Sequence, residues 1–150
     1  MPFKTLLPKL GFQPKENTSG IFVKKYTDGY TIEVNYEKQT FYFGGKIKVY
    51  DKDIQNIIKP EDWIVLECMD RLLTTEYKPE NISLEKVYPS GHGFSGRLDI
   101  CVTREYGSEY LLIISNSYLL GVKFEYIIFH RPIFKLLHIF LFKSLLKSKK

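Results

Sequence analysis

The stretch "SGHGFSGRLDICV", residues 90–102, contains residue types that suit a metal-dependent site for cleaving phosphodiesters. Asp99 lies at the start of an expected strand, Gly96 permits close approach of the backbone, and Arg97 can contact a phosphate. A divalent cation binds hard oxygen ligands such as carboxylates and activates a water molecule for attack on phosphorus. Asp99 is therefore the candidate metal ligand, and Mg²⁺ is the cofactor expected if the site works.

The second half of such a site is absent from the following strand. An economical geometry places a Glu-x-Lys pair there, because residues two apart in a strand point the same way. The expected strand "YLLII" continues instead with Ser115, Asn116 and Ser117. The later acids lack a lysine two residues on, and the one Glu-x-Lys of the chain, Glu76-Tyr77-Lys78, falls at an expected helix end. The site is half present.

The residues before Asp99 have two open interpretations. His92, Ser95 and Arg97 lie beside glycines and can contact a phosphate backbone, which positions DNA without reading its sequence. Alternatively, "GHGFSG" is a flexible turn with a solvated histidine.

The elements that position these residues follow from local patterns. A helix is expected from about Pro60 to Thr75, because Pro60 fits the first helical position and apolar residues recur at helical spacing. Glu61 and Asp62 suit the positive end of its dipole, and Trp63 is expected to anchor the core. The runs "ISLEKVY", "GRLDICVT" and "YLLIIS" then have strand composition. A helix followed by three strands predicts an α+β layer.

An antiparallel β-meander is expected ahead of that layer. Residues 21–50 alternate apolar and polar residues, with hairpin signals at Asp28-Gly29 and Gly44-Gly45. Residues 3–12 predict a short helix or turn that is broken by Pro8 and closed by Gly11. We expect three regions: a leader at 1–58, a partial core at 59–125 and a basic hydrophobic tail at 126–150.

Residues 60–114 resemble the N-terminal nuclease module of type I restriction enzyme R subunits. They are closer still to modules that precede N6-adenine DNA methyltransferases in fused restriction–modification proteins. "SGHGFSGRLDI" is the most specific part of the resemblance. It implies a partial restriction-endonuclease-like fold of the PD-(D/E)xK type, an α/β core with a helix and a mixed sheet. It also implies Mg²⁺-dependent hydrolysis of DNA, and a methyltransferase or other restriction–modification component as partner.

The resemblance also assigns roles to residues. Asp99 matches the metal-binding aspartate, while Ser115 and Ser117 stand where the metal-binding glutamate and the catalytic lysine belong. Glu67 is a possible helix carboxylate, although an i,i+4 pair with Arg71 is the favoured interpretation. The sequence departs from the family pattern after Ile114. Beyond Glu125 it contains no acidic residue, a composition that suits an AT-rich gene read in a shifted frame. Our hypothesis is a frameshifted, truncated or degenerate module, inactive alone.

The charge distribution leaves two alternatives to a nuclease module. The net charge is +5, but residues 1–125 carry 16 basic and 17 acidic residues, so the excess of positive charge belongs to the tail. A non-catalytic DNA-binding or regulatory module is one alternative, and a protein that binds a membrane surface or a partner through a basic amphipathic tail helix is the other. No apolar run is long enough to span a membrane. His130 and His138 are interpreted as simple tail residues, and Cys68 and Cys101 as buried thiols in a reducing cytoplasm.

Overall fold

The first part of the chain forms an antiparallel sheet of four strands. The computed structural model describes residues 3–51, 55–90, 94–104, 109–117, 124–130, 135–136 and 140–141, with side chains described within 3–51, 55–87 and 97–104. A short helix, α1 (Leu6–Lys9), precedes the sheet. The strands follow in the order β1-β2-β3-β4, with bounds β1 (Gln13–Pro14), β2 (Ile21–Lys25), β3 (Thr31–Asn35) and β4 (Thr40–Tyr42). The expected antiparallel meander is confirmed for β2, β3 and β4, whereas residues 48–49, which were expected within it, pair with the second sheet instead.

Of the two predicted hairpin signals, only Asp28-Gly29 lies at a hairpin turn, because the β3–β4 turn lies at residues 36–39 and the chain leaves this sheet after Gly44-Gly45. Asp28 and Gly29, in the 3-10 turn η1 (Thr27–Gly29) between β2 and β3, have φ of 61° and 74°. These are the positive values that the central residues of a type I′ turn require. Gly44 follows β4 with φ of 78°, and a Cβ at this position would lie 2.5 Å from Tyr30 Oη. Glycine at position 44 is therefore required both by the backbone angle and by the space available.

Helix α2 (Pro60–Thr74) matches the predicted helix within one residue. Pro60 occupies its first turn, where a missing N–H costs nothing because that group has no partner within the helix. Residues 62–70, together with Leu72 and Leu73, are buried, so the helix is covered on nearly all sides. A helix buried in this way lies inside a layered core instead of on its surface.

The second sheet is mixed. Its order is β10-β9-β8-β7-β6-β5, with β11 also paired to β9. Strands β5 and β6 are parallel, and the other pairs are antiparallel. The bounds are β5 (Lys48–Val49), β6 (Ile82–Ser90), β7 (Phe94–Thr103), β8 (Glu109–Ser117), β9 (Phe124–His130), β10 (Lys135–Leu136) and β11 (Phe140–Leu141), and the 3-10 turn η3 (Pro79–Asn81) leads into β6.

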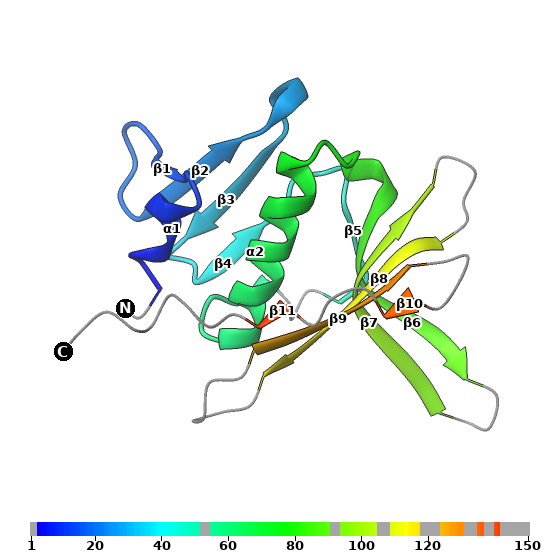
Figure 1. The fold of residues 1–150 in the computed structure, drawn as a ribbon. Helices are drawn as coiled ribbons and strands as arrows, with labels where there is room; N and C mark the ends of the chain where they lie inside the picture. Colours follow the sequence, from blue (N-terminus) through cyan, green and yellow to red (C-terminus); the bar gives the residue numbers. More distant parts are fainter. Residues whose placement is uncertain are drawn as a thin grey trace.

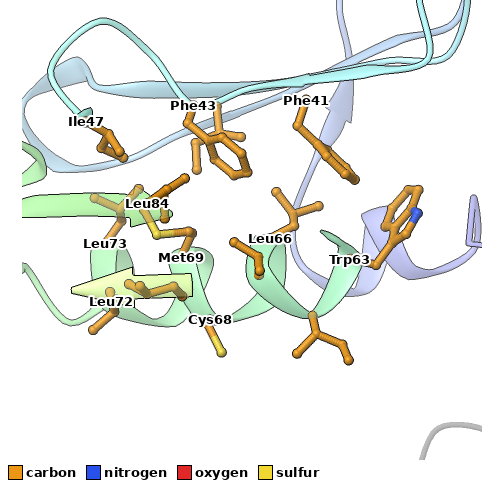
Figure 2. Packing of buried hydrophobic residues seen from close by; sticks show 14 of the residues in the cluster. Phe41, Phe43, Ile47, Trp63, Leu66, Cys68, Met69, Leu72, Leu73 and Leu84 are labelled. Carbon is orange, nitrogen blue, oxygen red and sulfur yellow. The ribbon is translucent and has the colours of Figure 1, made fainter. Parts of the chain in front are cut away.

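Helix α2 lies between the two sheets and joins them into one core (Figure 1). Phe41 of β4 and Phe43, which follows that strand, pack on one side of the helix, near Leu66 and Met69 (Figure 2). Trp63 is 3% exposed, its ring is 5.1 Å from that of Phe41, and its Nε1 donates a hydrogen bond to Ile57 O at 2.7 Å. The prediction that Trp63 anchors the core is confirmed. The α+β class is confirmed as well, and the expected leader and core regions share one hydrophobic cluster.

The described part of the tail differs from the helix considered for it. Residues 135–136 and 140–141 are strand residues paired with β9, and β9 itself crosses the boundary expected between residues 125 and 126. The β-branched and aromatic side chains of "FEYIIFH" suit a strand, and β8 offers it a partner to pair with. The helical interpretation is wrong for these residues. Among the residues that the structure describes, no helix combines the length and the apolar composition needed to cross a bilayer.

Candidate functional site

Asp99 lies on the central strand of the antiparallel hairpins β6–β7–β8. The pairs Leu84↔Ile100 and Lys86↔Leu98 flank Glu85 and Asp99, so these two acids stand opposite each other on β6 and β7. Asp99 is half-buried, and Glu85 is 5% exposed. Glu85 also has φ of 56°, a left-handed value that is unusual for a non-glycine residue within a strand.

Arg97 links two carboxylates from different segments. Its Nε lies 2.5 Å from Glu85 Oε2, and its Nη1 lies 3.4 Å from Asp51 Oδ2. Asp51 reaches this place because β5 runs parallel to β6, with Val49 opposite Leu84 and the Tyr50 N–H donating to Leu84 O at 3.1 Å. We call Asp51, Glu85, Arg97 and Asp99 the Arg97 cluster.

Two buried acids, one in the Arg97 cluster and one at the adjacent start of α2, have raised pKa values. The pKa of Glu85 is raised, first by burial, and also by the charges of Asp99 and Asp51, while Arg97 and Lys59 act in the opposite direction. Burial raises the pKa of Asp62, in the first turn of α2, to about 7. The favourable helix dipole expected at Asp62 is therefore outweighed by desolvation. Acidic residues that lie close together and have perturbed pKa values are typical of functional sites, although structural ion-pair networks also perturb pKa values.

Glu67 is engaged within its own helix. Arg71 Nη2 donates to Glu67 Oε1 at 2.7 Å, with the glutamate side chain 8% exposed. The favoured i,i+4 interpretation is confirmed by this contact.

The remaining predicted site residues are placed only by their backbones or lie outside the described residues. His92 lies outside them. Ser95 pairs with Pro89 across the β6–β7 hairpin, whereas Ser115 and Ser117 pair with Tyr126 and Phe124 of β9. The β7–β8 pair Ile100↔Ile113 brings the backbone of β8 beside Asp99, two residues before Ser115.

The structure thus adds Glu85 and Asp51 to the residues that the sequence singled out. Glu85 belongs to a predicted strand, but its place opposite Asp99 depends on a register that one sequence does not reveal. Asp51 lies in the Arg97 cluster because β5 and β6, which are far apart in the chain, pair in parallel. Within the described ranges, no three His, Cys, Asp or Glu side chains lie close enough together to hold a metal ion.

A pocket of about 300 Å³ lies elsewhere, between the β2–β3 turn and the end of α2. It shares no residue with the Arg97 cluster. Its lining combines tyrosine rings with acids and lysines: Tyr26, Thr27, Asp28, Tyr30, Lys46, Leu73, Glu76, Tyr77, Lys78, Pro79 and Glu80. Cys68 and Cys101 are buried thiols, as expected.

Comparison with known proteins identifies no relative: no protein family, curated protein or solved structure matches this chain.

Proposed function

We propose that this chain is a degenerate Mg²⁺-dependent endonuclease module of a restriction–modification system, without turnover as it stands. The placement of Asp99 carries the proposal. A buried helix, α2, is followed by three antiparallel strands, and Asp99 lies on the middle strand beside the strand that contains Ser115. That order agrees with the order expected from the resemblance of residues 60–114. The proposal implies DNA as the substrate, a methyltransferase or other restriction–modification component as partner, and action in the cytoplasm.

The lack of turnover follows from the chemistry of the serines. A neutral hydroxyl is a weaker ligand for Mg²⁺ than a carboxylate, and it cannot replace a lysine that stabilises charge on the phosphate. Ser115 and Ser117 therefore leave Asp99 without the second ligand and the cationic group that hydrolysis needs.

Nicking of supercoiled plasmid DNA in Mg²⁺ tests the proposal. The natural chain should be inactive, and Ser115→Glu with Ser117→Lys should gain Mg²⁺-dependent nicking that Asp99→Asn then removes. Ser115→Ala with Ser117→Ala changes the same positions without adding a ligand or a charge, so it is the matched control. Nicking by the natural chain that persists in Asp99→Asn would contradict the proposal.

A non-catalytic DNA-binding module is the second candidate, favoured by the exposure of Arg97. Its side chain is 57% exposed although it contacts two carboxylates. A phosphate contact predicts that Arg97→Ala weakens DNA binding and reduces its salt dependence. Arg104→Ala removes an equal charge just beyond β7, so it is the control for a general loss of positive charge. Salt-dependent binding in folded variants that never nick DNA would favour this candidate.

A further inference from the structure

The pocket between the β2–β3 turn and the end of α2 is lined by three tyrosines, Tyr26, Tyr30 and Tyr77, within a volume of about 300 Å³. Two of their hydroxyl groups are engaged by the protein itself. Tyr26 donates to Asp70 Oδ1 at 2.7 Å, and Tyr30 donates to Phe43 O. A tyrosine whose hydroxyl proton is already used offers a ligand mainly its ring, and the face of that ring is electrostatically negative. These tyrosines therefore favour a ligand that carries positive charge.

The charged residues of the pocket favour the same sign of ligand. Three acids, Asp28, Glu76 and Glu80, line the pocket together with two lysines, Lys46 and Lys78, and all five residues are exposed. Taken as ionised, they contribute three negative charges and two positive charges, which leaves one negative charge in excess. Both the rings and the charged side chains thus favour a cation over an anion.

Helix α2 ends at this pocket with an acid where glycine is the usual residue. Tyr77 N–H donates to Leu72 O at 3.0 Å and Glu76 N–H donates to Leu73 O at 3.2 Å, the two hydrogen bonds of a Schellman motif. Glu76 has φ of 67°, a left-handed value that glycine adopts without strain. Its carboxylate also lies at the negative end of the helix dipole, where cations are stabilising and acids are not. A cation bound beside Glu76 would offset that unfavourable charge.

We propose that this pocket binds a small organic cation, an ammonium group that carries alkyl substituents. Such a cation is attracted to the faces of tyrosine rings, and its alkyl groups pack against them. The volume of about 300 Å³ is at the lower end of the range for ligand pockets, which suits a small ligand. A metal ion fits less well, because in the part of the chain that the structure describes no three acids lie close enough together to hold one. The inference does not rest on the proposed function, since the pocket and the Arg97 cluster have no residue in common.

Titration of the full-length protein with choline, followed by NMR, tests the inference. The matched probe is dimethylbutanol, the neutral analogue that has carbon in place of the choline nitrogen. Choline should bind about tenfold or more tightly, because only the charged probe gains from the rings and the carboxylates. Equal affinities for the two probes, or no binding of choline, would overturn the inference.

Variants of Glu76 separate a binding role from a structural one. Glu76→Gly should raise the melting temperature, because glycine accepts the left-handed backbone, and should weaken choline binding at the same time. Glu76→Gln should weaken binding about two- to fivefold, as expected for the loss of one exposed charge. Glu16→Gln, at an exposed acid outside the pocket, is the control. Choline affinity that is unchanged in both Glu76 variants would contradict the inference, and so would a lower melting temperature in Glu76→Gly.

Lys46 and Tyr77 provide tests of opposite sign. Lys46→Gln removes a repulsive charge, so it should bind choline more tightly, whereas weaker or unchanged binding would count against a cation site. Tyr77→Leu keeps an apolar side chain without the ring and should weaken binding about fivefold, while Tyr77→Phe should restore it. Full affinity in a folded Tyr77→Leu would also overturn the inference. If Tyr77→Leu does not fold, the variants at the exposed positions Lys46 and Glu76 decide the outcome.

Discussion

Lys24 and Asp70 form an ion pair that joins the first sheet to the central helix. Lys24 Nζ lies 2.5 Å from Asp70 Oδ1 and also donates to Leu10 O at 2.6 Å. Tyr26 donates its hydroxyl to the same Asp70 oxygen at 2.7 Å, and burial raises the pKa of that tyrosine. The side chains of Lys24 and Asp70 are 19% and 9% exposed, so the contact is largely shielded from water. One carboxylate thus connects β2 with α2 across 46 residues of sequence.

Removing one member of this pair should destabilise the protein more than removing both. Asp70→Ala leaves Lys24 largely buried without its counter-ion, and breaking a buried pair in this way costs about 3–5 kcal/mol. Combining Asp70→Leu with Lys24→Met should recover part of that loss. Urea unfolding of both single variants and the double variant measures the coupling.

The exposed pair Lys15–Glu33, at 2.7 Å, is the matched control. Its side chains are 43% and 27% exposed, and an exposed ion pair contributes about 0–1 kcal/mol. If Lys15→Met lowers the free energy of unfolding as much as Lys24→Met does, burial does not explain the stabilising effect of the Lys24–Asp70 pair.

Leu66 tests the packing of α2 against β4. It is fully buried beside Phe41 of β4 and Phe43, which follows β4 (Figure 2). Leu66→Ala should lower the free energy of unfolding by about 2–5 kcal/mol, because it removes apolar contacts and leaves a cavity. Thr74→Ala, at an exposed position of the same helix, should change it by about 0.5 kcal/mol or less. Similar losses in both variants would mean that helix propensity, not packing, determines the effect.

Adjacent glycines after β4 should respond differently to the same substitution. Gly44→Ala should destabilise the fold by about 1–3 kcal/mol, because φ is 78° and the new Cβ would collide with Tyr30, whose hydroxyl contacts Phe43 O. A Cβ at Gly45 meets nothing within 4 Å, so Gly45→Ala is the control. Thermal unfolding of both variants measures the difference. Equal melting temperatures would show that the Tyr30 contact does not hold this turn.

Asp62 should make the protein less stable as pH rises toward neutrality. Burial raises its pKa to about 7, above the value of about 3.9 expected in the unfolded chain. The folded state therefore binds the extra proton between these values, and stability falls as pH rises from about 4 to 7. Lys59, Glu61 and Glu85 also act on Asp62, and the raised pKa of Glu85 contributes a slope of the same sign.

Asp62→Asn should flatten this dependence while keeping an acceptor for the Asn56 N–H, which donates to Asp62 Oδ2 at 3.3 Å. Each unit of pKa difference corresponds to about 1.4 kcal/mol, so a change of about 1 kcal/mol or more between pH 5 and pH 8 is expected to disappear. Glu37→Gln, at an exposed acid that is not among the charges acting on Asp62, is the control. If the free energy of unfolding of Asp62→Asn depends on pH as strongly as that of the natural chain, other groups cause the dependence.

Local sequence by itself determined most of the secondary structure. Proline at the first helical position and apolar residues at helical spacing predict α2, because both signals act within a few turns of one helix. Likewise, Asp28 and Gly29 predict the hairpin, since few residue pairs accept positive φ at both positions. The run containing Asp99 and the absence of Glu-x-Lys after it can also be read without any structure.

Only the tertiary structure decided which side chains meet. Glu85 stands opposite Asp99 because of the β6–β7 register, and Asp51 reaches Arg97 through the parallel pairing of β5 with β6. Register and pairing depend on contacts between distant segments, and a shift of one residue would turn every side chain to the other face. Pairing between distant segments also decides the structure of residues 135–136 and 140–141. Their composition allows a helix, but they form strands because they pair with β9. The pairing of Lys24 with Asp70 likewise exists only where β2 packs beside α2.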